Sequence, residues 1–224
     1  MMKFASFMAQ QNQSFKDGVN GYFASALDEL FMYKDIINHP QGEPLTGTYW
    51  FKDTQICVAR DTEGKSDGFF FAAKGGNNQE SHNHNDVGSC ILYYNALPVL
   101  IDAGVGTYTR QTFGPERYTI WTMQSDYHNL PLINGTPQKN GREFAAHSQQ
   151  YKSHRQNRIL PGGHCPCLSA GSNVKSWIRN YTLHRKKDFI YTDKWKLSAC
   201  NEPSVLNLMN LLRSRNRPQR KTLY

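Results

Sequence analysis

Short runs of apolar residues, separated by turn signals, fill the chain from about Gly47 onward and predict β-strands. The dipeptide Asn134-Gly135 is a strong hairpin signal between two such runs. The predicted strands cover residues 48–51, 55–60, 68–73, 90–94, 99–102, 118–123, 130–133, 175–183 and 189–197. A long antiparallel series of this kind predicts a mainly β fold, most simply an antiparallel β-sandwich.

The first part of the chain has a different period. Residues 4–37 repeat apolar positions at helical spacing, with an interruption at residues 15–18, and His39-Pro40 ends the pattern. We therefore divide the chain into a helical segment (1–45), a β-sandwich (46–210) and a basic tail expected to be disordered (211–224). Because a helix pair cannot bury its apolar stripe alone, the segment either leans on the next domain or ends an absent helical domain.

The net charge of +8 is unevenly distributed. Residues 1–150 hold 11 Lys/Arg and 15 Asp/Glu, a net charge of −4, whereas residues 151–224 hold 15 and 3, a net charge of +12. A solvated basic tail explains this distribution, and a groove for acidic sugars or nucleic acid is the alternative. Residues 155–172 also lack periodicity and are a second candidate for disorder.

The five cysteines are too few and odd in number for a disulfide framework in 224 residues. Cys57, Cys90 and Cys200 lie in apolar or strand-like surroundings, so we expect them to pack as small hydrophobic side chains. His164-Cys165-Pro166-Cys167 offers metal donors but has no second pair at zinc-finger spacing.

The N-terminus predicts no signal peptide, because residues 1–10 contain no long apolar stretch. No run reaches membrane-spanning length, so we expect no membrane partner. On these grounds the chain is either cytoplasmic or an internal piece of a longer exported protein.

Residues 81–86 (SHNHND) concentrate imidazoles, amides and a carboxylate between two predicted strands. In an extended segment His82 and His84 face the same way, whereas in a bent loop they take separate roles. Asp102 follows another strand, and His128 precedes the strand at 130–133. Imidazole and carboxylate are ordinary zinc ligands, so strand ends that meet would form a His/His/Asp site. Otherwise Asp102 caps a turn and the histidines bond carbonyl groups in the core.

Other chemistries have weaker support. The glycines at 75–76 and 104–106 lack the context of a phosphate-binding loop, and Ser81 has no nucleophile elbow. A dense group of aromatic residues lies near the histidine motif and is either core or a platform for sugars. The group comprises Tyr108, Phe113, Tyr118, Trp121 and Tyr127.

Several motifs in order resemble the heparinase II/III-like polysaccharide lyases. The resemblance is dense over residues 50–145 and looser from Trp177 to Asp193. It is carried by residues 74–76 (KGG), 80–88 (ESHNHNDVG), 100–108 (LIDAGVGTY), Tyr118, Trp121, 124–131 (QSDYHNLP), 133–135 (ING) and Gln138. Members of this family join an N-terminal (α/α) toroid to antiparallel β-sheets, so the chain looks like the β part with the last toroid helices.

The resemblance implies cleavage of uronic-acid polysaccharides by β-elimination. It assigns His82 to the substrate cleft, with Tyr118 as a second catalytic residue. It also implies a largely structural zinc ion held by His84, Asp102 and His128. Glu80, Asn83 and Tyr127 are the expected substrate-binding residues. The implied partner is an acidic glycan, a glycosaminoglycan or a similar polymer, rather than a nucleic acid or a membrane.

The principal Tyr base and the carboxylate-neutralising residue of the family lie largely in the toroid, which this chain does not contain. We therefore expect a lyase fragment that is weakly active or inactive alone. A non-catalytic carbohydrate-binding or structural β-sandwich is the alternative, and metal-dependent hydrolysis is a third reading. We expect the parent enzyme to act in the periplasm or outside the cell.

Overall fold

The computed structural model describes residues 6, 23–43, 45–150, 162–164, 173–211 and 222–223. Contacts divide the chain into two compact units, Met1–Thr46 and Gly47–Tyr224.

The first unit contains helix α2 (Phe23–Asn38), which is 16 residues long. The helix ends immediately before the His39-Pro40 stop signal, as predicted, and the Ser6 hydroxyl donates a hydrogen bond to the His39 carbonyl at 2.7 Å. The earlier part of the predicted helical region lies mostly outside the described residues. Among the described helices, none has the length and apolar character that crossing a membrane requires.

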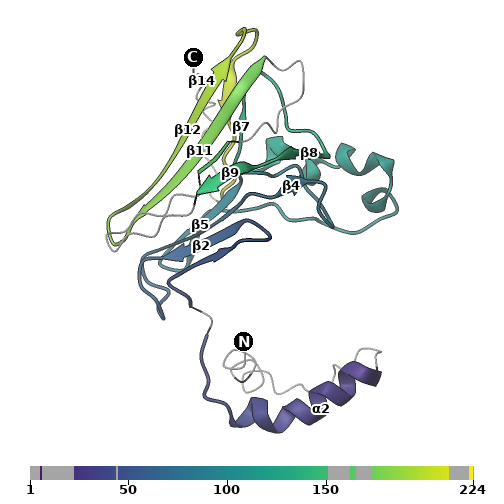
Figure 1. The fold of residues 1–224 in the computed structure, drawn as a ribbon, viewed down its shortest axis with the longest axis vertical. Helices are drawn as coiled ribbons and strands as arrows, with labels where there is room; N and C mark the ends of the chain where they lie inside the picture. The colour runs from purple at the N-terminus through teal and green to yellow at the C-terminus, as the bar shows by residue number, and fades with distance from the viewer. Residues whose placement is uncertain are drawn as a thin grey trace. The chain divides into compact units, whose positions relative to one another are not determined.

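A five-stranded antiparallel sheet forms one layer of the second unit (Figure 1). Its strand order is β1-β2-β3-β5-β6, so it is a nearly sequential meander. The strands are β1 (Thr48–Phe51), β2 (Ile56–Arg60), β3 (Phe69–Lys74), β5 (Cys90–Tyr94) and β6 (Leu97–Leu100). The predicted strand at 99–102 thus begins two residues earlier, because Asn95 and Ala96 adopt positive φ values and already complete the turn.

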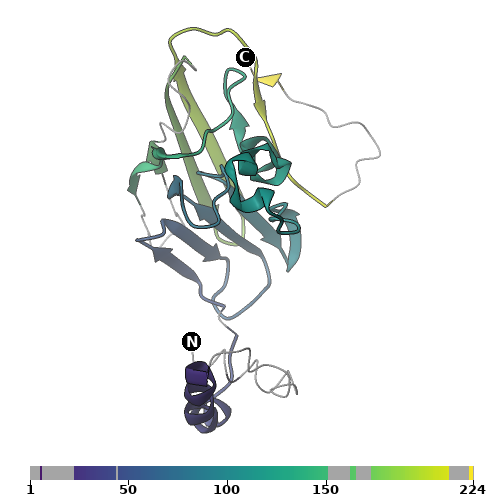
Figure 2. The ribbon, with the colours of Figure 1, turned by 90° about the vertical axis from the view of Figure 1, so that its right-hand side faces the viewer.

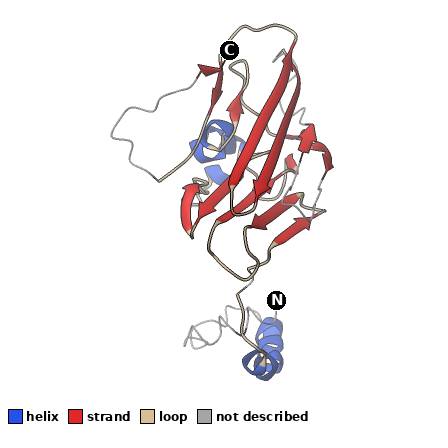
Figure 3. Ribbon diagram, turned by 90° about the vertical axis from the view of Figure 1, so that its left-hand side faces the viewer, coloured by secondary structure: helices blue, strands red, loops and turns tan. Residues whose placement is uncertain are grey.

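The opposite layer is dominated by a long hairpin of β11 (Val174–His184) and β12 (Asp188–Leu197), which Figure 3 shows as the two longest strands. Both strands agree with the predicted runs at 175–183 and 189–197. The sheet order is β12-β11-β10-β9, with β9 (His147–Gln150) and β10 (Gly162–His164). Apart from β10, residues 155–172 lie outside the described residues, as do Cys165 and Cys167.

Two smaller sheets complete the described strands. One has the order β14-β13-β7 and the other pairs β4 with β8. They comprise β4 (Asn77–Asn78), β7 (Pro131–Leu132), β8 (Gly141–Ala145), β13 (Ser204–Leu206) and β14 (Thr222–Leu223). Strand β14 lies within the range expected to be a disordered tail, most of which is outside the described residues.

The main core forms where the two layers face each other. Phe71 and Leu92 from the five-stranded sheet pack with Tyr181 and Leu183 from β11, all nearly inaccessible to solvent. A second cluster of buried residues comprises Val87, Leu130, Ile133, Ala146 and Trp177. These two cores confirm the predicted mainly β, antiparallel sandwich with a short N-terminal helix.

Four single-turn 3-10 helices follow β6 and gather on one side of the unit (Figure 2). They are η1 (Gln111–Phe113), η2 (Pro115–Thr119), η3 (Trp121–Met123) and η4 (Ser125–Tyr127). The strand predicted at 118–123 is therefore wrong. The Ile120 and Met123 amides donate to carbonyls three residues earlier, at 3.1 and 3.0 Å, so local turns replace ladder bonds.

The cysteine prediction is right at two positions of three. Cys57 and Cys90 are buried in the core, and burial raises the pKa of the Cys57 thiol to about 12. Cys200 is exposed, contrary to expectation, because β12 ends at Leu197 and the residue lies in the loop that follows.

Candidate functional site

Three separate loops bring two imidazoles and a carboxylate together. His84 lies between β4 and β5, Asp102 lies two residues beyond β6, and His128 directly follows η4. One possible ligand atom from each residue lies within 4.8 Å of those of the other two. The sheet therefore gathers three residues that are up to 44 positions apart in the sequence.

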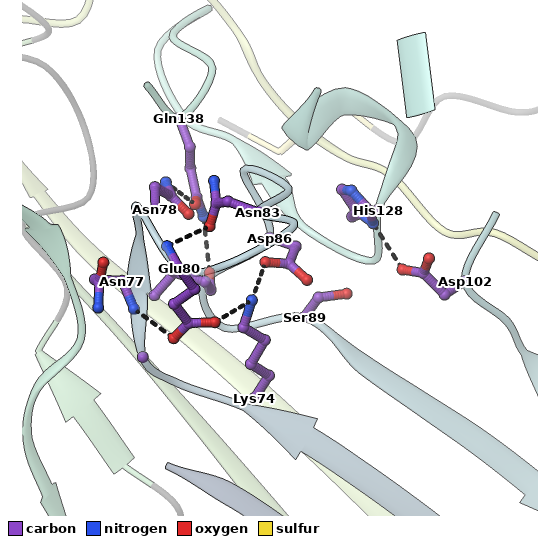
Figure 4. Close-up of polar contacts among 12 residues, drawn as sticks. Lys74, Asn77, Asn78, Glu80, Asn83, Asp86, Ser89, Asp102, His128 and Gln138 are labelled. Carbon is purple, nitrogen blue, oxygen red and sulfur yellow. Dashed lines mark hydrogen bonds and ion pairs between the residues drawn. The ribbon is translucent and has the colours of Figure 1, made fainter. Parts of the chain in front are cut away.

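His128 is the centre of this cluster. Its Nδ1 lies 2.7 Å from Asp102 Oδ2, as Figure 4 shows, and its ring centroid is 5.4 Å from that of His84. Its side chain is 0% exposed, and within the described part of the chain its Nε2 has no hydrogen-bond partner. A buried polar atom without a partner is unfavourable unless something else satisfies it, so Nε2 is free to bind a ligand.

The protonation states also suit a cation. Burial lowers the pKa of His84, an effect that the nearby carboxylates only partly offset. Burial favours the protonated form of Asp102, but the hydrogen bond and charge of His128 outweigh it and lower the pKa of the carboxyl. A neutral imidazole and an ionised carboxylate are the forms that bind a metal, so the shifts at His84 and Asp102 favour binding of a divalent cation.

The loop between β4 and β5 is held by a partly buried network of polar side chains. Lys74 lies between Asp86 at 2.6 Å and Glu80 at 3.1 Å (Figure 4). Burial disfavours its ammonium group, yet the two carboxylates outweigh this effect and raise the pKa of Lys74. Gln138 adds a bond from its amide to the Val87 carbonyl at 2.8 Å. The network fixes the loop on the side facing β3.

The two histidines of the SHNHND segment have separate surroundings. His82 adopts a φ of 55°, a left-handed conformation that bends the loop at that residue. Its exposed ring lies edge-on to Tyr108 and Phe113, at centroid distances of 5.8 and 5.7 Å, while His84 faces His128. The structure therefore supports separate roles rather than two parallel ligands.

His82 lines a pocket of about 420 Å³, as does Asn83, which directly precedes the candidate ligand His84. Two other predicted site residues line it: Glu80 and Tyr118. The Asn83 amide donates to the Tyr118 hydroxyl at 3.1 Å, and the Glu80 backbone amide donates to the Asn83 side chain at 3.3 Å. Asn83 is buried and thus orients Tyr118 within the pocket.

Tyr127 does not line this pocket. It packs on Trp121 at a centroid distance of 5.0 Å, and both rings are about half exposed. The carboxylate of Glu80 is bound to Lys74 and to the Asn77 amide, so two groups of the protein already occupy it.

Sequence reasoning missed Arg117, which also lines the pocket. Its side chain is buried, and its Nε and Nη2 donate to the Asn83 carbonyl at 2.9 and 2.7 Å. The same guanidinium donates to the Thr112 carbonyl at 2.5 Å. No local pattern distinguishes it from a surface arginine, because its partners are backbone groups from another loop.

These features define a β-sandwich that carries a candidate metal centre next to an open, polar pocket. The family model described as "Heparinase II/III-like, C-terminal" matches residues 47–194, so the chain belongs to the heparinase II/III-like family. A comparison with curated proteins finds no match.

Solved structures with the same fold include heparinases. The chain is 17% identical to a heparinase III with methylated lysines, over 81% of this chain and 27% of that one, with a TM-score of 0.60. It is 21% identical to another heparinase III, over 76% and 26%, with a TM-score of 0.58. It is 15% identical to the heparan sulfate lyase HepC from Pedobacter heparinus, over 92% and 30%, with a TM-score of 0.60. The chain thus spans less than a third of the length of these proteins.

Proposed function

We propose that this chain is the C-terminal β-module of a polysaccharide lyase that cleaves uronic-acid-containing glycans by β-elimination. The observation that carries the proposal is the pocket lined by His82 and Tyr118. His82 is two residues before the candidate metal ligand His84, and all three residues lie within the part of the chain that matches the family model. Glycosaminoglycans are the substrate class that the names of the related heparinases suggest. On this view the parent enzyme meets its polymer in the periplasm or outside the cell.

The reaction requires removal of a weakly acidic C5 proton and protonation of the oxygen that leaves C4. His82 is exposed at the pocket, with Nδ1 3.3 Å from the Tyr108 hydroxyl, and its neutral ring can accept a proton. Tyr118 presents a hydroxyl that Asn83 orients, and it can donate a proton to the leaving oxygen. The two residues thus provide the proton-transfer groups that this module would contribute.

The metal in this proposal is Zn²⁺, held by His84, Asp102 and His128. When bound, it supplies a multivalent cross-link among three loops, which is mainly a structural contribution. Asp102 and His128 meet at 2.7 Å, and the orphaned Nε2 of His128 adds a further donor. The loop bearing His84 also carries His82, so a fixed metal ligand stabilises the position of the proposed catalytic ring.

We expect weak activity or none from this chain alone. Elimination also needs a group that neutralises the uronate carboxylate, because charge develops there as the proton leaves C5. Arg117 is the only arginine lining the described pocket, and three of its five N–H donors are already bonded to the Asn83 and Thr112 carbonyls. The proposal therefore places the neutralising group elsewhere in the parent enzyme.

The test is a long incubation of concentrated chain with heparan sulfate, hyaluronan and alginate, followed by absorbance of the unsaturated uronate product. We expect a trace of product with one polymer, lost in His82→Ala and in Tyr118→Phe. Rapid turnover would contradict the need for another domain. Saturated sugar products would identify a hydrolase instead.

A second candidate is a carbohydrate-binding module without catalysis. The observation in its favour is two pairs of exposed aromatic rings, Tyr108 with Phe113 beside His82 and Trp121 with Tyr127. Tyr108 and Phe113 stack at 5.4 Å with an interplanar angle of 12°, which presents a flat apolar surface to a sugar ring. This function predicts binding of a polymer without any unsaturated product, and the appearance of unsaturated product after long incubation would support the lyase over it.

A further inference from the structure

Arg179 is a buried cation at the junction of the two layers. It lies on the inward face of β11, is 5% exposed, and forms a two-pronged ion pair with Asp193 of β12. The two bonds, Nε to Oδ1 and Nη2 to Oδ2, are both 2.7 Å long. The Trp177 indole also donates to Asp193 at 2.8 Å, so the carboxylate that anchors Arg179 is itself fixed.

The remaining guanidinium nitrogen reaches out of the hairpin to two loops. Arg179 Nη1 donates to the Gly88 carbonyl at 3.0 Å and to the Asn129 carbonyl at 2.5 Å. Gly88 is four residues after His84 in the same loop, and Asn129 is the residue after His128. One side chain therefore fixes the backbones of both histidine-bearing segments relative to each other.

Asn129 extends this link to the third segment. Its side-chain amide donates to the Cys90 carbonyl at 2.7 Å and to the Ile101 carbonyl at 2.9 Å. Its Oδ1 accepts from the Met209 amide at 2.7 Å, so every polar group of this buried side chain is used. Ile101 directly precedes Asp102, and the Asn129 bond thus holds the backbone that carries the carboxylate.

The chemistry of both residues suits this role. A guanidinium group is planar with five donors, so it can hold a carboxylate with one edge and two carbonyls with another, which an ammonium cannot do. The rings of Trp177 and Tyr191 lie 5.3 and 5.2 Å from the guanidinium carbon and restrict its orientation. An amide side chain likewise offers two donors and one acceptor in a fixed plane.

We propose that Arg179 and Asn129 are the positioning residues of the metal centre: together they hold the His84, His128 and Asp102 segments at the separation that binds a cation. The inference rests on the metal site proposed above. It assigns a role to two residues that touch neither metal nor sugar, and one of them comes from a distant strand. Outer partners of this kind typically contribute 10- to 100-fold to metal affinity.

The rival interpretation is that Arg179 only stabilises the core. The two interpretations differ in a measurable way, because a change in global stability does not alter the affinity of the folded state while nearly all molecules remain folded. Leu183 provides the matched control. It lies on the same face of β11, four residues further on, and is fully buried in the main core.

The experiment titrates Co²⁺ into the metal-free full chain, follows the visible absorption bands of the ion, and determines Kd by competition with a chelator. Arg179→Lys and Asn129→Ala should each raise Kd about 10- to 100-fold and change the shape of the bands. Leu183→Ala should lower the urea midpoint of the metal-free chain about as much as Arg179→Lys and Asn129→Ala do. Unlike those two substitutions, it should leave Kd within about twofold of the wild-type value.

Equal Kd values in the wild-type chain, Asn129→Ala and Leu183→Ala would overturn the inference while leaving the metal site intact. If Arg179→Lys fails to fold, Asn129→Ala alone decides. Failure of the wild-type chain to bind Co²⁺ would overturn the metal site and this inference together.

Discussion

His128 is a fully buried side chain that is also a candidate metal ligand. One of its ring nitrogens bonds Asp102 at 2.7 Å, and the other, Nε2, is buried without a described partner. A histidine that served only packing would normally satisfy both nitrogens or leave one in water. The combination of an oriented ring and an unsatisfied atom is the residue-level basis for a metal at this position.

The first prediction concerns the donors themselves. His84→Ala and Asp102→Ala should each abolish stoichiometric zinc binding, because two remaining donors hold the ion much less tightly. Both should also lose the increase in melting temperature that zinc gives the wild-type chain. The readouts are metal content per chain after gel filtration and thermal denaturation with and without zinc.

The matched control for these variants is His184→Ala. His184 also pairs with a carboxylate, Asp188 at 2.5 Å, but it belongs to no metal-binding group among the described residues. Its removal should leave zinc content unchanged. Unchanged zinc content in His84→Ala as well would refute the ligand set.

The second prediction is a pH dependence of the metal-free chain. Burial holds the pKa of His84 below its ordinary value of 6.5, so the unfolded chain takes up this proton first as the pH falls. The stability that depends on neutral His84 is therefore present above pH 6.5 and decreases as the pH falls toward the folded pKa. The urea midpoint, measured in chelator, should be lower at about pH 5.5 than at about pH 7.5.

His84→Gln isolates this contribution, because an amide does not titrate in this range. The variant should show a smaller decrease of the urea midpoint over the same pH interval. The same decrease in both proteins would mean that His84 does not contribute to the pH dependence.

At the scale of elements, the hairpins follow directly from local chemistry. Asn134 and Gly135 have φ values of 52° and 67°, and the Thr136 amide donates to the Ile133 carbonyl at 3.0 Å. The turn predicted from the Asn134-Gly135 dipeptide is therefore confirmed. The segment 118–123 was mispredicted, because its apolar residues pack from successive 3-10 turns rather than from one strand face. Tertiary contacts with the His84 loop decide that conformation, and no short window of sequence contains them.

The third prediction tests the Asn134-Gly135 turn. A side chain at Gly135 would meet both a left-handed φ of 67° and the Glu202 Cβ at 2.9 Å. Gly64 has a similar φ of 77° but open space around it. Gly135→Ala should therefore lower the free energy of unfolding by more than Gly64→Ala, which should cost about 1 kcal/mol from backbone strain alone. Equal losses in urea denaturation would contradict a role for the contact with Glu202.

At the scale of the whole molecule, the sequence indicated the candidate metal ligands better than the side chains that hold their loops in place. Two imidazoles and an acid at three strand ends left open whether they form a cluster, and the family resemblance selected His84, Asp102 and His128 as the ligand set. The positions of Arg117 and Arg179 were not predictable, since each acts through backbone carbonyls of loops that are distant in sequence. Such contacts depend on chain path and not on composition.

The proposal that this chain is part of a larger lyase also belongs to this scale. The chain covers 26% to 30% of the length of the heparinase structures that share its fold. Its β unit contains the proposed proton-transfer residues and metal donors, while Arg117, the one arginine lining the described pocket, already binds backbone carbonyls with three of its donors. The activity expected of this chain is accordingly a small fraction of that of a complete lyase.

The most direct test of the account is anomalous diffraction at the zinc absorption edge from crystals of the zinc-loaded chain. The account predicts one strong anomalous peak in contact with His84, Asp102 and His128, with the ring of His82 turned away from it toward the pocket. A peak at the His164–Cys167 segment instead, or three donor side chains with no peak between them, would contradict it.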